Sequence, residues 1–136
     1  MKIELRLDHI ALSVRDLATS VKFYSEVLGL PEIENRTRRP TIRWFGIDGT
    51  RAFHLITGRD EPPPDRPLSS HFCLSTPKFD ETLEWLREKG VTFVNLAGEV
   101  GKYSFRADGV RQAYCRDPDN YWVEICESDE DRKSVV

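Results

Sequence analysis

The chain contains an internal repeat, and this repeat limits the folds that it can adopt. The segment SHFCLST at residues 70–76 repeats the segment DHIALSV at residues 8–14. In both copies a histidine takes the second position, a leucine the fifth and a serine the sixth. A helix-like segment and several β-rich segments follow each copy. Each copy, together with the segments that follow it, makes a unit of roughly 55 to 60 residues. Because a unit of this size buries little surface by itself, the two units are expected to pack together as one domain.

The first copy is predicted to fold as a strand, a helix and three further strands, a βαβββ module. Asp16 is a suitable N-cap for the helix, because its side chain can accept a hydrogen bond from the first helical turn. Asp48 and Gly49 indicate a two-residue turn between the last two strands. The expected elements are a β-rich segment over 3–14, a helix over 16–30 and strands over 32–38, 41–47 and 51–56.

A proline-rich segment precedes the second copy. Residues 58–67 carry four of the eight prolines, so they form neither a helix nor a central strand and are expected to be an exposed linker. The second helix is expected to have Pro77 at its first helical position, and Asn120 is expected in a left-handed conformation within a tight turn. Further strands are predicted over 91–94, 110–116 and 121–126, with 97–109 as a possible flap.

These elements predict an α+β fold with two βαβββ modules in one domain. The boundaries are module one over 3–57, the proline-rich linker over 58–68, module two over 69–127 and a polar tail over 128–136.

Composition excludes several classes of protein. The net charge of −3 does not fit an overall basic nucleic-acid binder, and no apolar run approaches the length of a membrane span. The first ten residues alternate charged and apolar side chains, which is unlike a signal peptide. The three cysteines show no disulfide pattern. We therefore expect a reduced, cytoplasmic protein with no nucleic-acid or membrane partner.

The chain has only three histidines, and all of them fall on matched positions of the repeat. His9 and His71 lie in the first strand of each module, and His54 and Glu124 lie in the last. Strand alternation places all four on the face opposite the bulky apolar residues. Imidazole and carboxylate groups bind Zn²⁺, Ni²⁺, Fe²⁺ or Mn²⁺, so we predict that these four residues hold one divalent ion. The alternative is that they are scattered polar residues on sheet faces.

Four further residues share a face with these predicted ligands. A two-residue turn would place Arg43 opposite His54, where it could hold an anionic group of a substrate, or it is simply a solvated arginine. Trp122 lies on the face of Glu124 and is a candidate wall of the pocket, with core packing as the alternative. Cys73 and Cys126 are interpreted as small packing residues rather than ligands.

The arrangement resembles the vicinal oxygen chelate superfamily, also called the glyoxalase/bleomycin-resistance/dioxygenase family. The resemblance is carried by LDHIALSVRDLATSVKFYSEVLGL at residues 7–30 and by DPDNYWVEI at residues 117–125. It implies an open, barrel-like mixed sheet around a metal cavity, with ligands from the first and last strands of each module. It also implies a homodimer, and Tyr114 as a pocket residue. A three- or five-residue loop before the last strand would point Tyr114 inward, whereas a four-residue loop would point Arg111 inward.

The resemblance implies a divalent-metal-dependent lyase or isomerase of glyoxalase type. Glu124 would be the base that removes a proton beside a carbonyl group of a small oxygenated substrate. Glyoxalase I usually has a glutamate where this chain has His54. Two alternatives stay open: an Fe(II) dioxygenase of the extradiol type, in which two histidines and Glu124 form a facial triad, and a non-catalytic protein that sequesters a ligand, as bleomycin-resistance relatives do.

Overall fold

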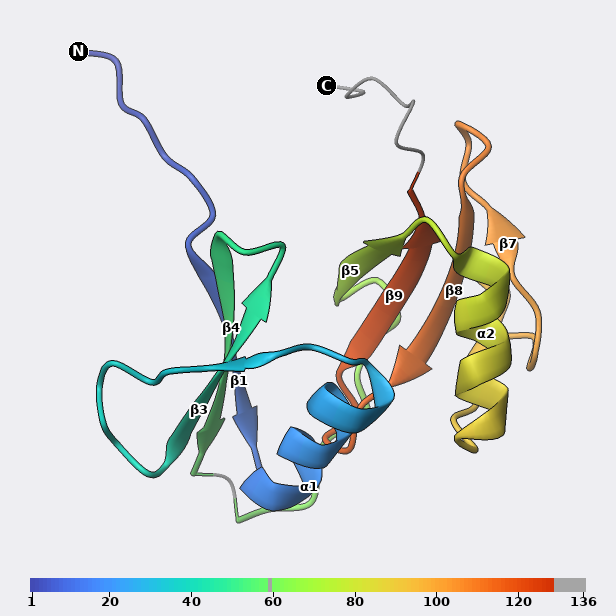
Figure 1. Cartoon of the computed structure of the whole chain (residues 1–136). Coiled ribbons are helices and arrows are strands. Elements are labelled where there is room, and N and C mark those ends of the chain that lie inside the picture. Colours follow the sequence, from blue (N-terminus) through green and yellow to red (C-terminus); the bar gives the residue numbers. More distant parts are fainter. Residues whose placement is uncertain (59, 129–136) are drawn as a thin grey trace. The chain divides into compact units, whose positions relative to one another are not determined.

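The computed structural model describes residues 1–58 and 60–128, and it shows an α+β protein with two mixed sheets (Figure 1). The chain forms two compact units, Met1–Pro63 and Pro64–Val136. In the described part of the chain, neither unit has a helix long and apolar enough to cross a membrane.

The first unit contains a four-stranded sheet in the order β1-β4-β3-β2. The side chain of Asp16 caps the first helix as predicted, accepting a hydrogen bond of 3.0 Å from the backbone N–H of Thr19. The helix then continues into one π-helical turn, which ends with a hydrogen bond from Leu28 N to Phe23 O. The elements are β1 (His9–Val14), α1 (Leu17–Lys22), η1 (Phe23–Val27), β2 (Glu32–Ile33), β3 (Ile42–Ile47) and β4 (Arg51–Thr57).

The second unit contains a five-stranded sheet in the order β5-β9-β8-β6, with β7 paired to β8. Helix α2 has buried Phe79, Leu83 and Leu86 along one side, which is the spacing of an amphipathic helix. The elements are β5 (His71–Thr76), α2 (Phe79–Glu88), β6 (Phe93–Val94), β7 (Ser104–Phe105), β8 (Arg111–Arg116) and β9 (Trp122–Glu127).

In each sheet the first and last strands of the module are parallel neighbours. Strand β1 pairs with β4, so that Ala11 lies opposite His54, and β5 pairs with β9, so that Cys73 lies opposite Glu124. Alternation along β1 buries Leu12 and Val14 and leaves His9 exposed. The predicted polar faces of the two first strands are therefore confirmed.

The turn between β3 and β4 is longer than predicted. Asp48, Gly49 and Thr50 form a three-residue loop, in which Asp48 (φ 48°) and Gly49 (φ 81°) are left-handed and Ile47 pairs with Arg51. The Asp48 carboxylate accepts a hydrogen bond of 2.7 Å from the Thr50 hydroxyl, which holds the extra residue in the loop. Because a slip of one residue exchanges the two faces of a strand, this loop changes which side chains lie beside His54.

Other boundaries also differ from the prediction. The strand expected over 32–38 ends at Ile33, and the Asn35 side chain instead makes hydrogen bonds within the following turn. Lys78 is the N-cap of α2, so Pro77 precedes the helix rather than opening it. The region 97–109, expected as a possible flap, contributes strand β7.

The β-rich segment at the N-terminus does not form a strand along its whole length. Residues 1–8 are extended and exposed, and β1 begins only at His9. The side chains of Ile3, Leu5 and Leu7 are 60% exposed or more. Figure 1 shows the segment, in blue, running beyond β1 without a neighbouring strand.

Candidate functional site

The second unit places a nearly buried carboxylate among ligand-type side chains. Glu124 on β9 is only 4% exposed. Its Oε1 atom lies 3.1 Å from Nε2 of His71, and its Oε2 atom lies 3.0 Å from Sγ of Cys73, both on β5. Tyr114 on β8 lies directly opposite Glu124. Burying a charged group without partners is costly, so this carboxylate is stable here because its neighbours supply donors.

His71 is oriented by a backbone carbonyl. Its Nδ1 atom lies 2.8 Å from the carbonyl oxygen of Leu68. A carbonyl only accepts, so Nδ1 carries a proton and donates it there. Nε2 therefore faces Glu124, and two acceptor atoms at this distance need a proton or a cation between them. The same arrangement, with the remote ring nitrogen fixed by a hydrogen bond, orients histidines that bind metals.

The thiol and hydroxyl groups near Glu124 are held in their neutral forms. Hydrogen bonding with Cys126, followed by burial and the contact with Glu124, raises the pKa of the Cys73 thiol well above its usual range. Burial, followed by a hydrogen bond to Glu124, raises the pKa of Tyr114. Cys73 and Tyr114 therefore donate to Glu124. A bound cation would have the opposite effect on the pKa values of Cys73 and Tyr114, because it favours the negatively charged forms of the thiol and the hydroxyl group.

The loop before β9 decides the orientation of Tyr114. Arg116 pairs with Trp122, which leaves five residues in the loop, so Tyr114 lies opposite Glu124 and its ring contacts His71 at 5.3 Å between centroids. Asn120 is left-handed in this loop (φ 63°), as predicted. Arg111 is used elsewhere, in ion pairs of 2.8 Å with Asp80 and 3.0 Å with Glu127.

In the first unit, three aromatic rings are stacked on the predicted ligand face. Trp44 and His54 lie with their centroids 4.3 Å apart and their planes at 8°. His54 and His9 are also 4.3 Å apart, at 16°. Nδ1 of His9 lies 2.8 Å from Oδ2 of Asp8, which orients this ring as Leu68 orients His71.

His54 has an unused ring nitrogen. Within the described residues, its Nε2 atom is buried and has no hydrogen-bond partner. Burial, with a smaller contribution from His9, lowers the pKa of His54, although Asp8 acts in the opposite direction. A neutral imidazole with a free lone pair is the form that binds metals. The imidazole and carboxylate groups of the two units are thus of the kinds that bind a divalent cation, and it stays a prediction that all four hold one ion.

Trp44, rather than Arg43, lies beside His54. The three-residue loop places Arg43 opposite Leu55 and Trp44 opposite His54. The expected pairing of Arg43 with His54 was therefore wrong, and the Arg43 guanidinium forms an ion pair with Glu32. The alternation of the sequence, read with the correct loop length, would have identified Trp44.

Trp122 is covered by the segment that was expected to be an exposed linker. Its indole N–H donates a hydrogen bond of 2.8 Å to the carbonyl oxygen of Arg66, and the Arg116 guanidinium lies 4.4 Å from its ring. The guanidinium of Arg66 stacks on Tyr121 at 3.8 Å. Arg66 is thus packed within the second unit, and its carbonyl oxygen occupies the indole N–H of Trp122.

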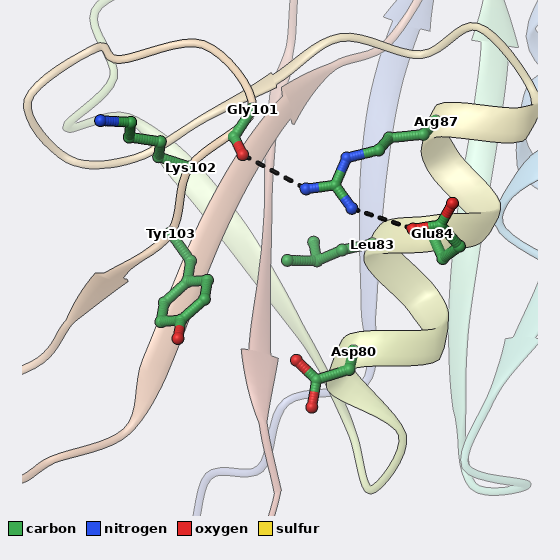
Figure 2. A pocket seen from close by; sticks show the side chains of 7 residues that line it. All are labelled: Asp80, Leu83, Glu84, Arg87, Gly101, Lys102 and Tyr103. Carbon is green, nitrogen blue, oxygen red and sulfur yellow. Dashed lines mark hydrogen bonds and ion pairs between the residues drawn. The ribbon is translucent and has the colours of Figure 1, made fainter.

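Each unit carries a cavity among its described residues. One, of about 490 Å³ in the first unit, is lined by Trp44 and His54 together with charged side chains, among them Asp8, Glu34, Arg36 and Arg51. The other, of about 410 Å³ in the second unit, lies between α2 and residues 101–103 (Figure 2). There Arg87 donates to the Gly101 carbonyl and pairs with Glu84. None of the predicted site residues lines this second cavity, so we place the candidate site on the sheets.

Comparison with known proteins gives a family match over most of the chain. Residues 6–125 match the model of the Glyoxalase/Bleomycin resistance protein/Dioxygenase superfamily. Virulence protein STM3117 of Salmonella typhimurium is 32% identical over 124 residues, which cover 88% of this chain and 82% of that protein. Lactoylglutathione lyase of Schizosaccharomyces pombe is 26% identical over 153 residues. The match covers 92% of this chain but only 48% of that enzyme.

Solved structures give the same fold. A glyoxalase/dioxygenase from Nostoc punctiforme matches with a TM-score of 0.75 at 23% identity, and the match covers 92% of each chain. Oxidase ChaP-H2 matches with a TM-score of 0.74 at 20% identity, over 97% of this chain and 100% of that one.

Proposed function

The chain belongs to the Glyoxalase/Bleomycin resistance protein/Dioxygenase superfamily, and from this membership we propose that it is a divalent-metal-dependent lyase or isomerase. The proposed reaction removes a proton beside a carbonyl group of a small oxygenated substrate. The observation that carries this proposal is the nearly buried Glu124 carboxylate, which contacts His71 and Cys73 at about hydrogen-bond distance. The similarity to a lactoylglutathione lyase supports the lyase class.

Glu124 is the proposed base. A divalent ion, when bound, would polarise the substrate carbonyl and favour loss of the neighbouring proton. The carboxylate accepts that proton and returns it to the substrate. The Tyr114 hydroxyl, which donates to Glu124, keeps the carboxylate oriented while the proton moves. His71 stays fixed throughout by its hydrogen bond to Leu68.

The proposed ligands of the ion are His9, His54, His71 and Glu124. The repeat supports this set, because it places two of them on the polar face of each sheet. The hydrogen bonds at Nδ1 of His9 and His71 also support it, since both leave Nε2 as the ligand atom. Zn²⁺, Ni²⁺, Fe²⁺ and Mn²⁺ all accept such ligands.

The metal content of untreated protein tests this function. We expect close to one divalent ion per chain. Preparations that are consistently free of metal would exclude the enzyme and leave a protein that sequesters a ligand. Iron, together with oxygen consumption in the presence of catechols, would indicate a ring-cleaving dioxygenase instead.

The proposal includes a small-molecule substrate, a homodimer and a cytoplasmic location. Cys73, Cys115 and Cys126, which all lie in the described part of the chain, form no disulfide, and this fits a reducing compartment. The exposed apolar side chains of Ile3, Leu5 and Leu7 alternate along an extended segment that lacks a partner strand among the described residues. Such a segment favours pairing with another chain, and a second copy is the partner that we propose.

A further inference from the structure

Two adjacent strands of the second unit carry a compact set of sulfur, oxygen and nitrogen ligands. Strand β5 contributes His71 and Cys73, and strand β9 contributes Glu124 and Cys126. In both strands the two residues are two positions apart, so all four side chains lie on one face. The parallel register sets Cys73 opposite Glu124 and Ser75 opposite Cys126.

The sulfur atoms lie close enough to the carboxylate to share an ion with it. The Sγ atoms of Cys73 and Cys126 and a carboxylate oxygen of Glu124 all lie within 4.8 Å of one another. Cys73 is exposed and Cys126 is buried, so the cluster has one side open to solvent. Nε2 of His71 lies 3.1 Å from Oε1 of Glu124, whereas Sγ of Cys73 contacts Oε2.

Packing does not account for the position of Cys73. A cysteine that only fills space is usually buried among apolar groups. The thiol of Cys73 is instead on an exposed residue and points at a carboxylate oxygen 3.0 Å away. The remaining cysteine, Cys115, shows the contrast, because it is 1% exposed and lies opposite Val123 on β9.

We propose that Cys73, Cys126 and Glu124 form a binding site for a thiophilic divalent ion such as Zn²⁺, located entirely within the second unit. Both thiols bind as thiolates, so two S–H bonds break, two sulfur–metal bonds form and the two protons pass to solvent. The inference goes beyond the proposed function, because it needs neither histidine of the first unit. The ligands of this site, two thiolates and one carboxylate, are softer than histidine and carboxylate alone, which favours Zn²⁺ over Mn²⁺.

Co²⁺ titration of the reduced full-length chain tests the site directly. Co²⁺ replaces Zn²⁺ in such sites, and its bond to a thiolate gives a charge-transfer absorption in the near ultraviolet. We expect this band in the wild type and in Cys115→Ser, the matched control. We expect Cys73→Ser and Cys126→Ser each to lose about half of the band at saturation, because one of the two thiolates remains. Each should also bind Co²⁺ about 100-fold more weakly or worse, since even groups that only orient a ligand contribute about 10- to 100-fold.

His54→Gln separates this inference from the proposed function. If the site lies within the second unit, the variant keeps the thiolate band at wild-type affinity. Co²⁺ binding without any thiolate band would overturn the inference and leave the function based on histidine and carboxylate intact. A thiolate band in a protein that shows no lyase or isomerase activity would support the site and count against the proposed function.

Thiol protection gives a second measurement that does not depend on the folding of variants. In the wild type, saturating Zn²⁺ should protect Cys73 from alkylation by iodoacetamide, as read by peptide mass spectrometry. Release of about two protons per bound Zn²⁺ should accompany it. Unchanged alkylation of Cys73 with Zn²⁺ present would overturn the inference.

Discussion

The indole of Trp44 covers the imidazole of His54, with the two ring planes only 8° apart. This contact results from the three-residue loop that sets β3 against β4. Burial is the largest cause of the lowered pKa of His54. Trp44 therefore contributes to keeping His54 neutral, with its Nε2 lone pair available.

Trp44→Ala should raise the pKa of His54 toward its usual value, because the variant exposes the ring to water. Proton NMR titration of the His54 ring, assigned with His54→Gln, measures this change. Trp85→Ala is the control, since Trp85 lies exposed on α2. An unchanged His54 titration in Trp44→Ala would show that Trp44 does not control this group.

Glu124→Gln should abolish turnover and lower the metal content only modestly. Glutamine keeps the shape of the side chain but cannot accept the substrate proton. Turnover of a substrate found by screening small hydroxy-carbonyl compounds, and elemental analysis of the same samples, provide the two readouts. Glu99→Gln, in an exposed loop, should match the wild type in both. Activity that survives in Glu124→Gln would mean that another group is the base.

Arg111→Met should reduce the free energy of unfolding by about 1 kcal/mol, because Arg111 joins Asp80 of α2 to Glu127 of β9. Chemical denaturation measures this loss. The control is Arg106→Met, whose guanidinium forms an ion pair with Asp108 two residues away in a surface turn, and we expect a smaller change there. Equal effects in the two variants would contradict a bridging role for Arg111.

Acid should weaken the ion pair between Arg111 and Glu127. The hydrogen bond from the Arg111 side chain is the main cause that lowers the pKa of Glu127 below its ordinary 4.5. The folded state therefore binds this proton less readily than the unfolded state. The resulting stabilisation is fully present above pH 4.5 and is lost as the pH falls further. Denaturation from pH 6 to pH 3.5 should show a smaller acid loss in Glu127→Gln than in the wild type.

Leu5→Lys should weaken the proposed homodimer. The substitution puts a charge on the apolar face formed by Ile3, Leu5 and Leu7. The control is Glu4→Lys, which changes the opposite face of the same extended segment. Sedimentation velocity over a range of protein concentrations measures the dimer. Equal dimerisation in the two variants would exclude this segment from the interface.

The repeat allowed much of the fold to be predicted, because strand alternation depends only on local spacing. From the repeat we predicted the polar faces of β1 and β5 and the helices that follow these strands. The sequence could not show which loop length joins β3 to β4, since Asp48 and Gly49 suit both a two-residue and a three-residue loop. The one extra residue in the loop shifts the register, so that Trp44 rather than Arg43 lies opposite His54.

The thiol cluster escaped the sequence analysis for a different reason. Cys73 and Cys126 were correctly placed on the faces of His71 and Glu124. The spacing between strands, however, depends on the parallel register of β5 and β9, which no local pattern specifies. For Tyr114, the sequence left two orientations open, and the five-residue loop before β9 decided between them.

The parallel pairing of first and last strands also determines when each half of the site forms during folding. Cys73 and Glu124 are 51 positions apart, whereas β8 and β9 are joined by a short loop. Closing a long loop costs more chain entropy, so distant pairs form late. Ligand groups on β5 and β9 therefore meet only after the local hairpin exists. A metal ion that binds both strands would slow unfolding, because it links the contacts that the folding chain makes last.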